Sequence, residues 1–372
     1  MGQLKIVSVM TTHSAGGAEF AAIEMLDALA ERGHQTVMLS DMPGIGRDSR
    51  VPVIPLEIGP KLAADTWGRL LVTSPALIAR LWRALAAQLP FDVLLVHYKK
   101  EQLLTAWLPA RLRRKLVWAE WGPIPFQLRR GFPRRAYLAA SRRAELVMAV
   151  SAGTKRSVEA VGVRADHVVV VPNVVDVEGI RFSPGGRIAV RERLGIPPEA
   201  FVVGCLSRFH PKKRNDVVVD AVLALRDPRT HLLLAGSGET EQQLRAQASP
   251  LADRAHFVPT PTGDVADVLS AFDVSVFCPS PTEGAPRATI LGMLASRPCL
   301  STGAEGVADM ISPEFGAILE SENDPGALAD LLRRYLDDPE LGPRQGAAAR
   351  AWAEQRYARP VVCGQIERLL AP

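Results

Sequence analysis

Short apolar runs alternate with amphipathic helical patterns along most of the chain, and this alternation constrains the fold more than any other feature. Leu4–Met10 and Phe201–Leu206 have the character of buried strands. Each is followed by a segment with helical spacing, Ala18–Arg32 after the first and Asn215–Leu225 after the second. Strands that alternate with helices in this way predict α/β domains built on parallel, doubly wound sheets.

The alternation is interrupted once, around residues 176–200, where Ser183-Pro184-Gly185-Gly186 and Pro197-Pro198 occur. Clusters of proline and glycine are typical of linkers. We therefore predict an N-terminal domain over residues 1–176, a linker over 177–200, a second domain over 201–356 and a last helical segment over 357–372. A chain of 372 residues is long enough for two domains of roughly 100–200 residues each.

The composition is that of an ordinary globular protein, with 44 Lys and Arg against 40 Asp and Glu. A net charge of +4 is too small to indicate nucleic-acid binding.

The four cysteines form no CxxC pair, so we expect no metal site, and no cofactor motif is visible. The N-terminus has no signal-peptide pattern and no apolar run approaches membrane-spanning length, so we expect a cytoplasmic protein. The Ala- and Arg-rich usage suggests a GC-rich bacterial source.

Seven short segments, most of them beside predicted strands, occur in an order and spacing that resemble glycosyltransferase family 4. The matching segments are Gly16-Gly17-Ala18-Glu19, Val150-Ser151, Pro172-Asn173-Val174-Val175-Asp176, Ser207-Arg208 through Lys213, Ala235-Gly236-Ser237-Gly238, Ser280 through Pro286, and Arg297-Pro298. The resemblance covers most of the chain. It implies the GT-B fold, in which two Rossmann-like domains face each other across a cleft and the last helix crosses back to the first domain.

The resemblance also implies a retaining glycosyltransferase, which moves a hexosyl or pentosyl group from a sugar diphosphate donor to an acceptor. Arg208 and Lys213 match the pair that binds the donor diphosphate. Their chemistry suits that role, because arginine offers a planar fork to phosphate oxygens and lysine a compact charge. Cations placed there stabilise the charge that grows on the leaving phosphate. A solvated basic turn is the alternative.

Glu283 matches the carboxylate that hydrogen-bonds a hydroxyl of the donor sugar in the family. The following segment, Gly284-Ala285-Pro286-Arg287, matches the backbone that meets the sugar and phosphate. Glycine after the acid permits close approach, and the free N–H groups of the next helix favour an anion. The alternative for Glu283 is an ordinary helix N-cap.

Further candidates have weaker signals. In the family the loop with Gly16 and Gly17 approaches both the donor phosphate and the acceptor, although a tight turn is the alternative. Gly236 and Gly238 either contact the donor or permit close packing of strand and helix. His97 falls where the family often has a catalytic-site histidine, and a structural histidine is the alternative.

Two positions depart from the family pattern. Relatives usually carry a second glutamate that holds the ribose hydroxyls of the nucleotide, and this chain has Leu291 there. An unpaired buried hydroxyl costs about 1–3 kcal/mol. Relatives also contact the base with backbone groups on the loop that corresponds here to Pro259-Thr260-Pro261-Thr262, where two prolines remove two N–H donors.

Positive charge is also in excess around the candidate phosphate pair, at His210, Lys212, Arg214 and Arg287. These are either surface charges or contacts to a donor with more phosphate and no nucleoside, such as phosphoribosyl diphosphate. Four interpretations stay open: a nucleotide sugar donor, phosphoribosyl diphosphate as the donor, a sugar-nucleotide epimerase or phosphorylase with the same two-domain layout, and an inactive GT-B-like partner protein, which Leu291 motivates.

The acceptor is a small molecule or a glycan that the sequence does not identify. Glu120 and Trp121, in the loop after a predicted strand, are the candidate acceptor-binding residues. The alternatives are a structural carboxylate for Glu120 and simple packing for Trp121. A basic belt accompanies Phe132, either as a solvated face or as a membrane contact, and we predict no continuous amphipathic helix there. The belt consists of Arg129, Arg130, Arg134, Arg135, Arg142 and Arg143.

Overall fold

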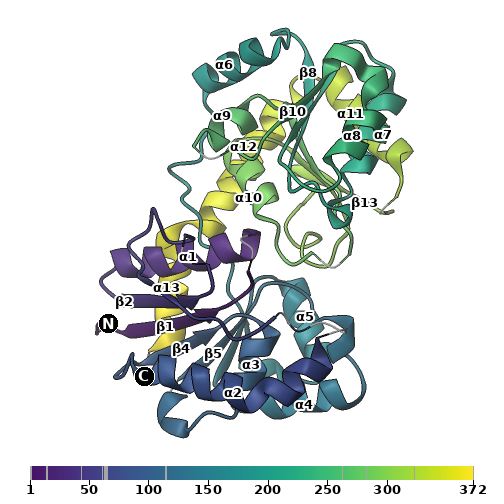
Figure 1. The fold of residues 1–372 in the computed structure, drawn as a ribbon. Helices are drawn as coiled ribbons and strands as arrows, with labels where there is room; N and C mark the ends of the chain where they lie inside the picture. Colours follow the sequence, from purple (N-terminus) through teal and green to yellow (C-terminus); the bar gives the residue numbers. More distant parts are fainter. Residues whose placement is uncertain are drawn as a thin grey trace. The chain divides into compact units, whose positions relative to one another are not determined.

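The computed structural model of the protein describes residues 2–371 except 14, 15, 43, 61, 63–65, 114, 262, 282 and 322, and the side chains at 67 and 69–71. The chain forms two compact units (Figure 1). Unit 1 contains Met1–Val175 and Arg359–Pro372, and unit 2 contains Asp176–Ala358. Each unit is an α/β domain with one parallel sheet, which confirms the predicted fold class.

Unit 1 is built on a seven-stranded sheet in the order β3-β2-β1-β4-β5-β6-β7, with every pair parallel. The strands are β1 (Lys5–Met10), β2 (Gln35–Ser40), β3 (Val53–Pro55), β4 (Val93–Val96), β5 (Leu116–Glu120), β6 (Leu146–Ala149) and β7 (Val168–Val170). The helices are α1 (Gly17–Glu31), α2 (Trp67–Ala86), α3 (Lys99–Thr105), α4 (Gly131–Ser141), α5 (Ala152–Ala160) and α13 (Arg359–Leu370).

Alternate strand residues of this sheet enter two separate apolar cores, because successive side chains point to opposite faces. Val7 and Val9 of β1 pack with residues of α2 and α4 on one face. Ile6 and Met10 pack with residues of α1 and α13 on the other. Figure 1 shows α13, the last helix of the chain, beside α1 in unit 1.

Unit 2 repeats this topology with a six-stranded sheet in the order β10-β9-β8-β11-β12-β13. The strands are β8 (Phe201–Leu206), β9 (Thr230–Ala235), β10 (Ala255–Val258), β11 (Val274–Phe277), β12 (Cys299–Thr302) and β13 (Gly316–Leu319). The helices are α6 (Pro184–Leu194), α7 (Asn215–Leu225), α8 (Glu241–Gln247), α9 (Val265–Ser270), α10 (Arg287–Leu294), α11 (Pro325–Asp337) and α12 (Leu341–Tyr357).

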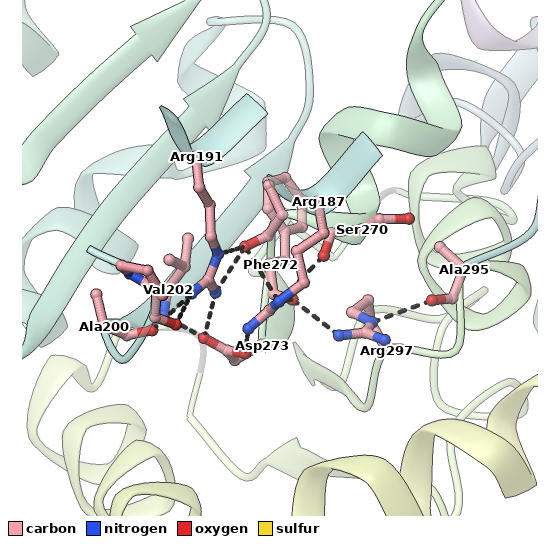
Figure 2. A network of polar contacts seen from close by, with 11 residues as sticks. Arg187, Arg191, Ala200, Val202, Ser270, Phe272, Asp273, Ala295 and Arg297 are labelled. Atoms are coloured by element: carbon pink, nitrogen blue, oxygen red, sulfur yellow. Dashed lines mark hydrogen bonds and ion pairs between the residues drawn. The ribbon is translucent and has the colours of Figure 1, made fainter. Parts of the chain in front are cut away.

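The segment predicted as a linker contains a helix that is fixed to unit 2. Helix α6 is N-capped by Ser183, whose hydroxyl accepts a hydrogen bond from the Gly186 amide, and it ends at Gly195 in the left-handed conformation. Figure 2 shows how arginines hold it in place: Arg187 and Arg191 bind backbone carbonyls at the end of α9 and both pair with Asp273. The proline and glycine cluster therefore begins a helix.

The arginines of this network lie at the edge where β8 and β11 begin. Asp273 precedes β11 and accepts a hydrogen bond from the Val202 amide at 2.7 Å. Arg297 donates to the carbonyls of Phe272 and Ala295, and burial lowers its pKa to about 10. Figure 2 shows these groups converging on the turn between α9 and β11. We assign the network a structural role, because its charges are used to satisfy backbone carbonyls within the unit.

Five helices and strands were not predicted from the sequence: the edge strands β3 and β13, and the helices α3, α4 and α6. Helix α4 lies in the basic belt, where we expected no continuous amphipathic helix. It begins at Gly131 and buries only Tyr137, Ala140 and Ser141, so its apolar stripe is short. The edge strands have three and four residues, too few to give a clear pattern.

Candidate functional site

The strand order of unit 2 places a topological switch point between β8 and β11. The chain leaves β8 toward β9 on one side and leaves β11 toward β12 on the other, and loops that diverge in this way leave a crevice at the carboxyl ends of the strands. The loops after β8 and β11 carry Arg208, Lys213 and Glu283. The fold therefore brings these three predicted residues to one edge of one sheet.

Lys213 and Glu283 form an ion pair, although 70 positions separate them in the chain. The Lys213 Nζ lies 2.8 Å from the Glu283 Oε2 and 5.2 Å from the centre of the Phe277 ring. The side chains are 21% and 24% exposed, so solvent still reaches both. The Ser280 amide donates to the Lys212 carbonyl at 2.9 Å, which ties the two loops together.

Arg208 differs from Lys213 in having no internal partner. Its side chain is exposed and makes no hydrogen bond or ion pair with any residue that the structure describes. It follows β8 by two residues, at the same sheet edge as Lys213. An exposed guanidinium at a switch point can bind two oxygens of an incoming phosphate without first breaking another contact.

The loop after β9 packs directly on the backbone beside Arg208. A Cβ at Gly236 would collide with the carbonyl oxygen of Ser207, and one at Gly238 with that of Phe209. Both glycines have positive φ, 157° and 152°. The Phe209 amide donates to the Ser237 carbonyl at 2.9 Å. Close backbone packing thus accounts for both glycines, and their predicted contact with the donor stays a prediction.

The segment after Glu283 is supported from behind by the loop after β12. The Gly306 amide donates to the Glu283 carbonyl at 3.0 Å, and a Cβ at Gly306 would collide with the Gly284 carbonyl. Gly284 and Pro286 are buried, whereas Ala285 and Arg287 are half-buried. Pro286 precedes α10, where the first N–H groups of a helix favour an anion. Thr282, which belongs to the same motif, lies outside the described residues.

The extra positive charge around the site is partly neutralised within the unit. Arg214 makes a two-pronged ion pair with Asp216, its nearest nitrogen–oxygen distance being 3.0 Å, and it donates to Asn323 at 2.6 Å. The His210 Nε2 lies 3.6 Å from a carboxylate oxygen of Glu239. These contacts remove much of the reason to expect a donor with three phosphates.

Leu291 lies on α10 and is half-buried against an apolar cluster of unit 2. The cluster includes Val202, Val258 and Leu269. The loop after β10 carries Thr260, whose hydroxyl oxygen lies 3.2 Å from the hydroxyl oxygen of Ser237. Leucine at this position offers a nucleoside apolar contact and no hydrogen-bond acceptor.

His97 lies at the end of β4, at the corresponding switch point of unit 1, and both of its ring nitrogens are occupied. The Trp121 Nε1 donates to the His97 Nδ1 at 3.0 Å, and because indole is a donor only, the ring must carry its proton on Nε2. That nitrogen lies 2.7 Å from the Ser8 hydroxyl. Burial lowers the pKa of His97 to about 3. The arrangement favours a structural role over the catalytic role that we expected.

Glu120 is likewise satisfied inside unit 1. It is buried, pairs with Lys99 and accepts a hydrogen bond from the Tyr137 hydroxyl at 2.9 Å. Burial lowers the pKa of Lys99, and Glu120 opposes that shift. Trp121 is half-buried and stacks on His97, with ring centres 5.7 Å apart. Neither residue presents a free group to an acceptor, so their predicted acceptor contacts gain no support from this geometry.

A buried polar cluster follows β1 and was not predicted from the sequence. The Thr12 hydroxyl donates to Glu19 at 3.1 Å, and Tyr98 donates to the same carboxylate. Glu101 accepts hydrogen bonds from the amide and hydroxyl of Thr11, and burial raises its pKa. No sequence spacing signals this cluster, since its members lie in the loop after β1, on α1 and at the start of α3.

The cluster fixes Thr11 and Thr12, which precede Gly16 and Gly17 in the chain. Gly16 is the N-cap of α1 in an extended conformation, and a Cβ at Gly17 would meet no atom within 4 Å. Internal packing therefore does not require glycine at position 17, in contrast to Gly236 and Gly238. Within the described residues, the open space beside Gly17 is compatible with the approach of a ligand, whereas a Cβ at Gly16 would lie 3.2 Å from the Glu19 Oε2.

Comparison with known proteins relates both units to glycosyltransferases. The sequence model of Glycosyltransferase Family 4 matches residues 15–178, and that of Glycosyl transferases group 1 matches residues 200–338. The D-inositol 3-phosphate glycosyltransferase of Stackebrandtia nassauensis is 27% identical over 91% of this chain and 83% of its own. A GDP-mannose-dependent phosphatidylinositol monomannoside mannosyltransferase of Corynebacterium glutamicum is 28% identical over 54% of this chain.

The chain spans about half the length of the first curated relatives that it matches, 55% of the Corynebacterium glutamicum protein and 40% of a Streptomyces avermitilis D-inositol 3-phosphate glycosyltransferase. Among solved structures, Anabaena HepE in complex with UDP-glucose has a TM-score of 0.84 at 22% identity, with 99% of each chain covered. That likeness concerns the fold.

Two parallel Rossmann-like sheets with a basic switch-point edge define a protein of the GT-B class. Within that class, the chain belongs to the glycosyltransferase family 4 type. No helix in the described part of the chain is long and apolar enough to cross a membrane.

Proposed function

We propose that the protein transfers a sugar from a nucleoside diphosphate sugar to an acceptor hydroxyl, with retention at the anomeric carbon. The observation that carries the proposal is the edge at β8 and β11, where Arg208 is exposed with no side-chain partner among the described residues and Lys213 lies beside Glu283. The relatives support a nucleotide donor, since one is named for GDP-mannose and a structural neighbour is bound to UDP-glucose.

Arg208 and Lys213 bind the diphosphate in this proposal and stabilise the charge that develops on it as it leaves. Glu283 accepts a hydrogen bond from a hydroxyl of the donor sugar and, through its ion pair, keeps Lys213 in position. The acceptor oxygen attacks the anomeric carbon from the face that the diphosphate leaves. The bond to the phosphate oxygen breaks, and that oxygen takes the acceptor proton. Retention follows from attack and departure on the same face.

Phosphoribosyl diphosphate remains the second candidate donor, and Leu291 is the observation that favours it. An apolar side chain at this position gives no acceptor for the hydroxyls of a nucleoside ribose. The ion pair between Arg214 and Asp216 counts against it, because it leaves one cation fewer for additional phosphate. The acceptor role of unit 1 stays a prediction.

A thermal-shift screen of nucleoside diphosphates, nucleotide sugars and phosphoribosyl diphosphate tests the proposal. A ligand at 100 times its dissociation constant stabilises a protein by roughly 2.7 kcal/mol. We expect at least one nucleoside diphosphate to raise the unfolding temperature, and Arg208→Ala to abolish the rise. Stabilisation by phosphoribosyl diphosphate alone would select the second donor. The absence of any shift, together with no product from any donor, would favour an inactive partner protein.

A further inference from the structure

A cavity of about 360 Å³ lies in unit 2, at the edge of the sheet where the strands begin. Its walls are β13, the second half of α11, the start of α12 and the loop of residues 311–313. The loop precedes β13, and every strand pair of this sheet is parallel. Arg208, Lys213 and Glu283 instead follow the carboxyl ends of their strands. The cavity is therefore separate from the candidate donor site.

The walls of the cavity are mainly apolar. Ile318 lines it from β13, Leu331 from α11, Leu341 from α12 and Ile311 from the loop. Ile311 is buried, whereas the other three are half-buried and still meet water. Protein interiors are normally packed with few voids larger than a water molecule. A hollow whose volume falls in the range of ligand pockets, about 300–1,000 Å³, leaves these side chains without contacts that a ligand would supply.

A chain of hydrogen bonds ties the walls of the cavity together. The Tyr335 hydroxyl on α11 donates to the Gln345 Oε1 on α12 at 2.6 Å. The Gln345 Nε2 donates to the carbonyl of Pro313, in the loop before β13, at 3.0 Å. Tyr335 and Gln345 are both buried, so these hydrogen bonds are sheltered from water. The chain fixes the spacing of the three segments, which favours a preformed binding site.

One charged side chain lines the cavity. Arg334 lies next to Tyr335 on α11, is exposed, and makes no hydrogen bond or ion pair with any residue that the structure describes. No aspartate or glutamate is among the described residues that line the cavity. The adjacent Arg333, by contrast, pairs with Asp330 at 2.8 Å. An unpaired guanidinium beside apolar walls matches a ligand that combines an apolar body with an acidic group.

We propose that the cavity between β13, α11 and α12 binds a small organic anion. The apolar body of the ligand lies against Ile318, Leu331 and Leu341, and its carboxylate, sulfonate or phosphate accepts hydrogen bonds from Arg334. A neutral ligand would leave the guanidinium unused, and an inorganic anion would leave the apolar walls uncovered. The proposal does not rest on sugar transfer, because none of the described residues that line the cavity belongs to the loops after β8 and β11.

Fluorescence titration of the full chain with 1-anilinonaphthalene-8-sulfonate tests the proposal, because this dye joins an aromatic body to one sulfonate. The uncharged N-phenyl-1-naphthylamine is the matched probe. We expect saturable binding of the sulfonate dye to the folded parent. Arg334→Gln should weaken that binding by about fivefold, the scale of an ion pair near the surface, and leave the uncharged probe unaffected. The neighbouring Arg333→Gln is the control and should bind both probes as the parent does.

Ser312→Phe tests the cavity itself. Ser312 is half-buried and lines the cavity from the loop, so a benzyl group there fills part of the space. Both probes should then bind at least roughly tenfold more weakly, because their apolar body no longer fits. Urea unfolding of each variant checks the fold, since such dyes also bind partly unfolded chains. Excess UDP or GDP should leave the bound dye in place.

The proposal is overturned if the folded parent does not bind the sulfonate dye, or if Arg333→Gln weakens it as much as Arg334→Gln. An equal loss of both probes in Arg334→Gln would contradict a ligand recognised by its charge. Binding that survives Ser312→Phe would place the dye outside the cavity. Displacement by UDP or GDP, or loss of binding in Arg208→Ala, would assign the dye to the candidate donor site and equally overturn the proposal.

Discussion

At the end of β4 in unit 1, His97 is buried and both of its ring nitrogens are bonded, whereas at the end of β8 in unit 2 Arg208 is exposed and has no internal partner in the described chain. The two sheets have the same strand order around their switch points. In unit 1 the polar residues at this edge mostly hold loops in place. In unit 2 the edge retains charge that a ligand can use. A shared topology therefore fixes where polar residues gather, and burial decides whether they serve stability or binding.

The largest expected difference between the two edges concerns stability. Glu120→Ala removes a buried carboxylate and leaves Lys99 and Tyr137 without their partner, which should lower the free energy of unfolding by about 3–5 kcal/mol. Glu283→Ala breaks the partly exposed pair with Lys213 and should cost about 1 kcal/mol or less. Urea unfolding of both variants measures the difference, and equal losses would erase the distinction between the edges.

For catalysis, we expect the larger effect at the edge of unit 2. Lys213→Ala should reduce turnover of the donor by about 100- to 1000-fold, because it removes a cation from the developing charge of the leaving diphosphate. Hydrolysis of the donor in the absence of acceptor gives a readout before the acceptor is known. Lys155→Ala, which removes a lysine from an ion pair with Glu159 on α5, is the matched control. Similar rates in Lys213→Ala and the parent would remove Lys213 from the site.

Acid should weaken unit 1 through His97. Burial lowers the pKa of His97 to about 3, against about 6.5 in the unfolded chain. Below pH 6.5 the unfolded state therefore binds a proton that the folded state does not, and stability falls as the pH falls toward 3. One such group contributes about 1.4 kcal/mol per pH unit. Urea unfolding at pH 7.5, 6 and 5 should show a shallower loss for His97→Gln, and parallel curves would contradict the buried neutral ring.

The smallest expected effect distinguishes the two candidate donors. With a nucleotide sugar, Leu291→Glu supplies a charged acceptor for ribose hydroxyls and should tighten binding by about 1–2 kcal/mol, or roughly tenfold. With phosphoribosyl diphosphate, the new carboxylate would repel phosphate and weaken binding. Calorimetry with each donor class gives the sign. No change with either would place position 291 outside the donor site.

The sequence predicted most of the fold because strands buried in parallel sheets are continuous apolar runs that even a short segment displays. The sequence did not predict elements whose stability depends on contacts with residues that are distant in the chain. Helix α6 begins in a proline and glycine cluster and is held by Arg187 and Arg191 through carbonyls some 80 positions away. The edge strand β13 has four residues and pairs on one side only.

The candidate site likewise has features that the sequence predicted and features that it could not predict. Arg208, Lys213 and Glu283 could be located because each follows a strand in a loop that precedes a helix. The Lys213–Glu283 pair could not be predicted, since it joins loops 70 positions apart. The enclosure of His97 could not be predicted either, since it depends on Ser8 in β1 and on Trp121 after β5.

The most direct test of the account is the affinity of the full chain for a nucleoside diphosphate, measured by calorimetry for the parent, Arg208→Ala and Arg129→Ala. Arg129 is an exposed arginine of unit 1 and serves as the control. A hydrogen bond to a charged group is worth about 1.5–3 kcal/mol, so Arg208→Ala should raise the dissociation constant by at least roughly tenfold, while Arg129→Ala leaves it unchanged. An unchanged dissociation constant in Arg208→Ala would contradict the assignment of the β8 edge to the donor diphosphate.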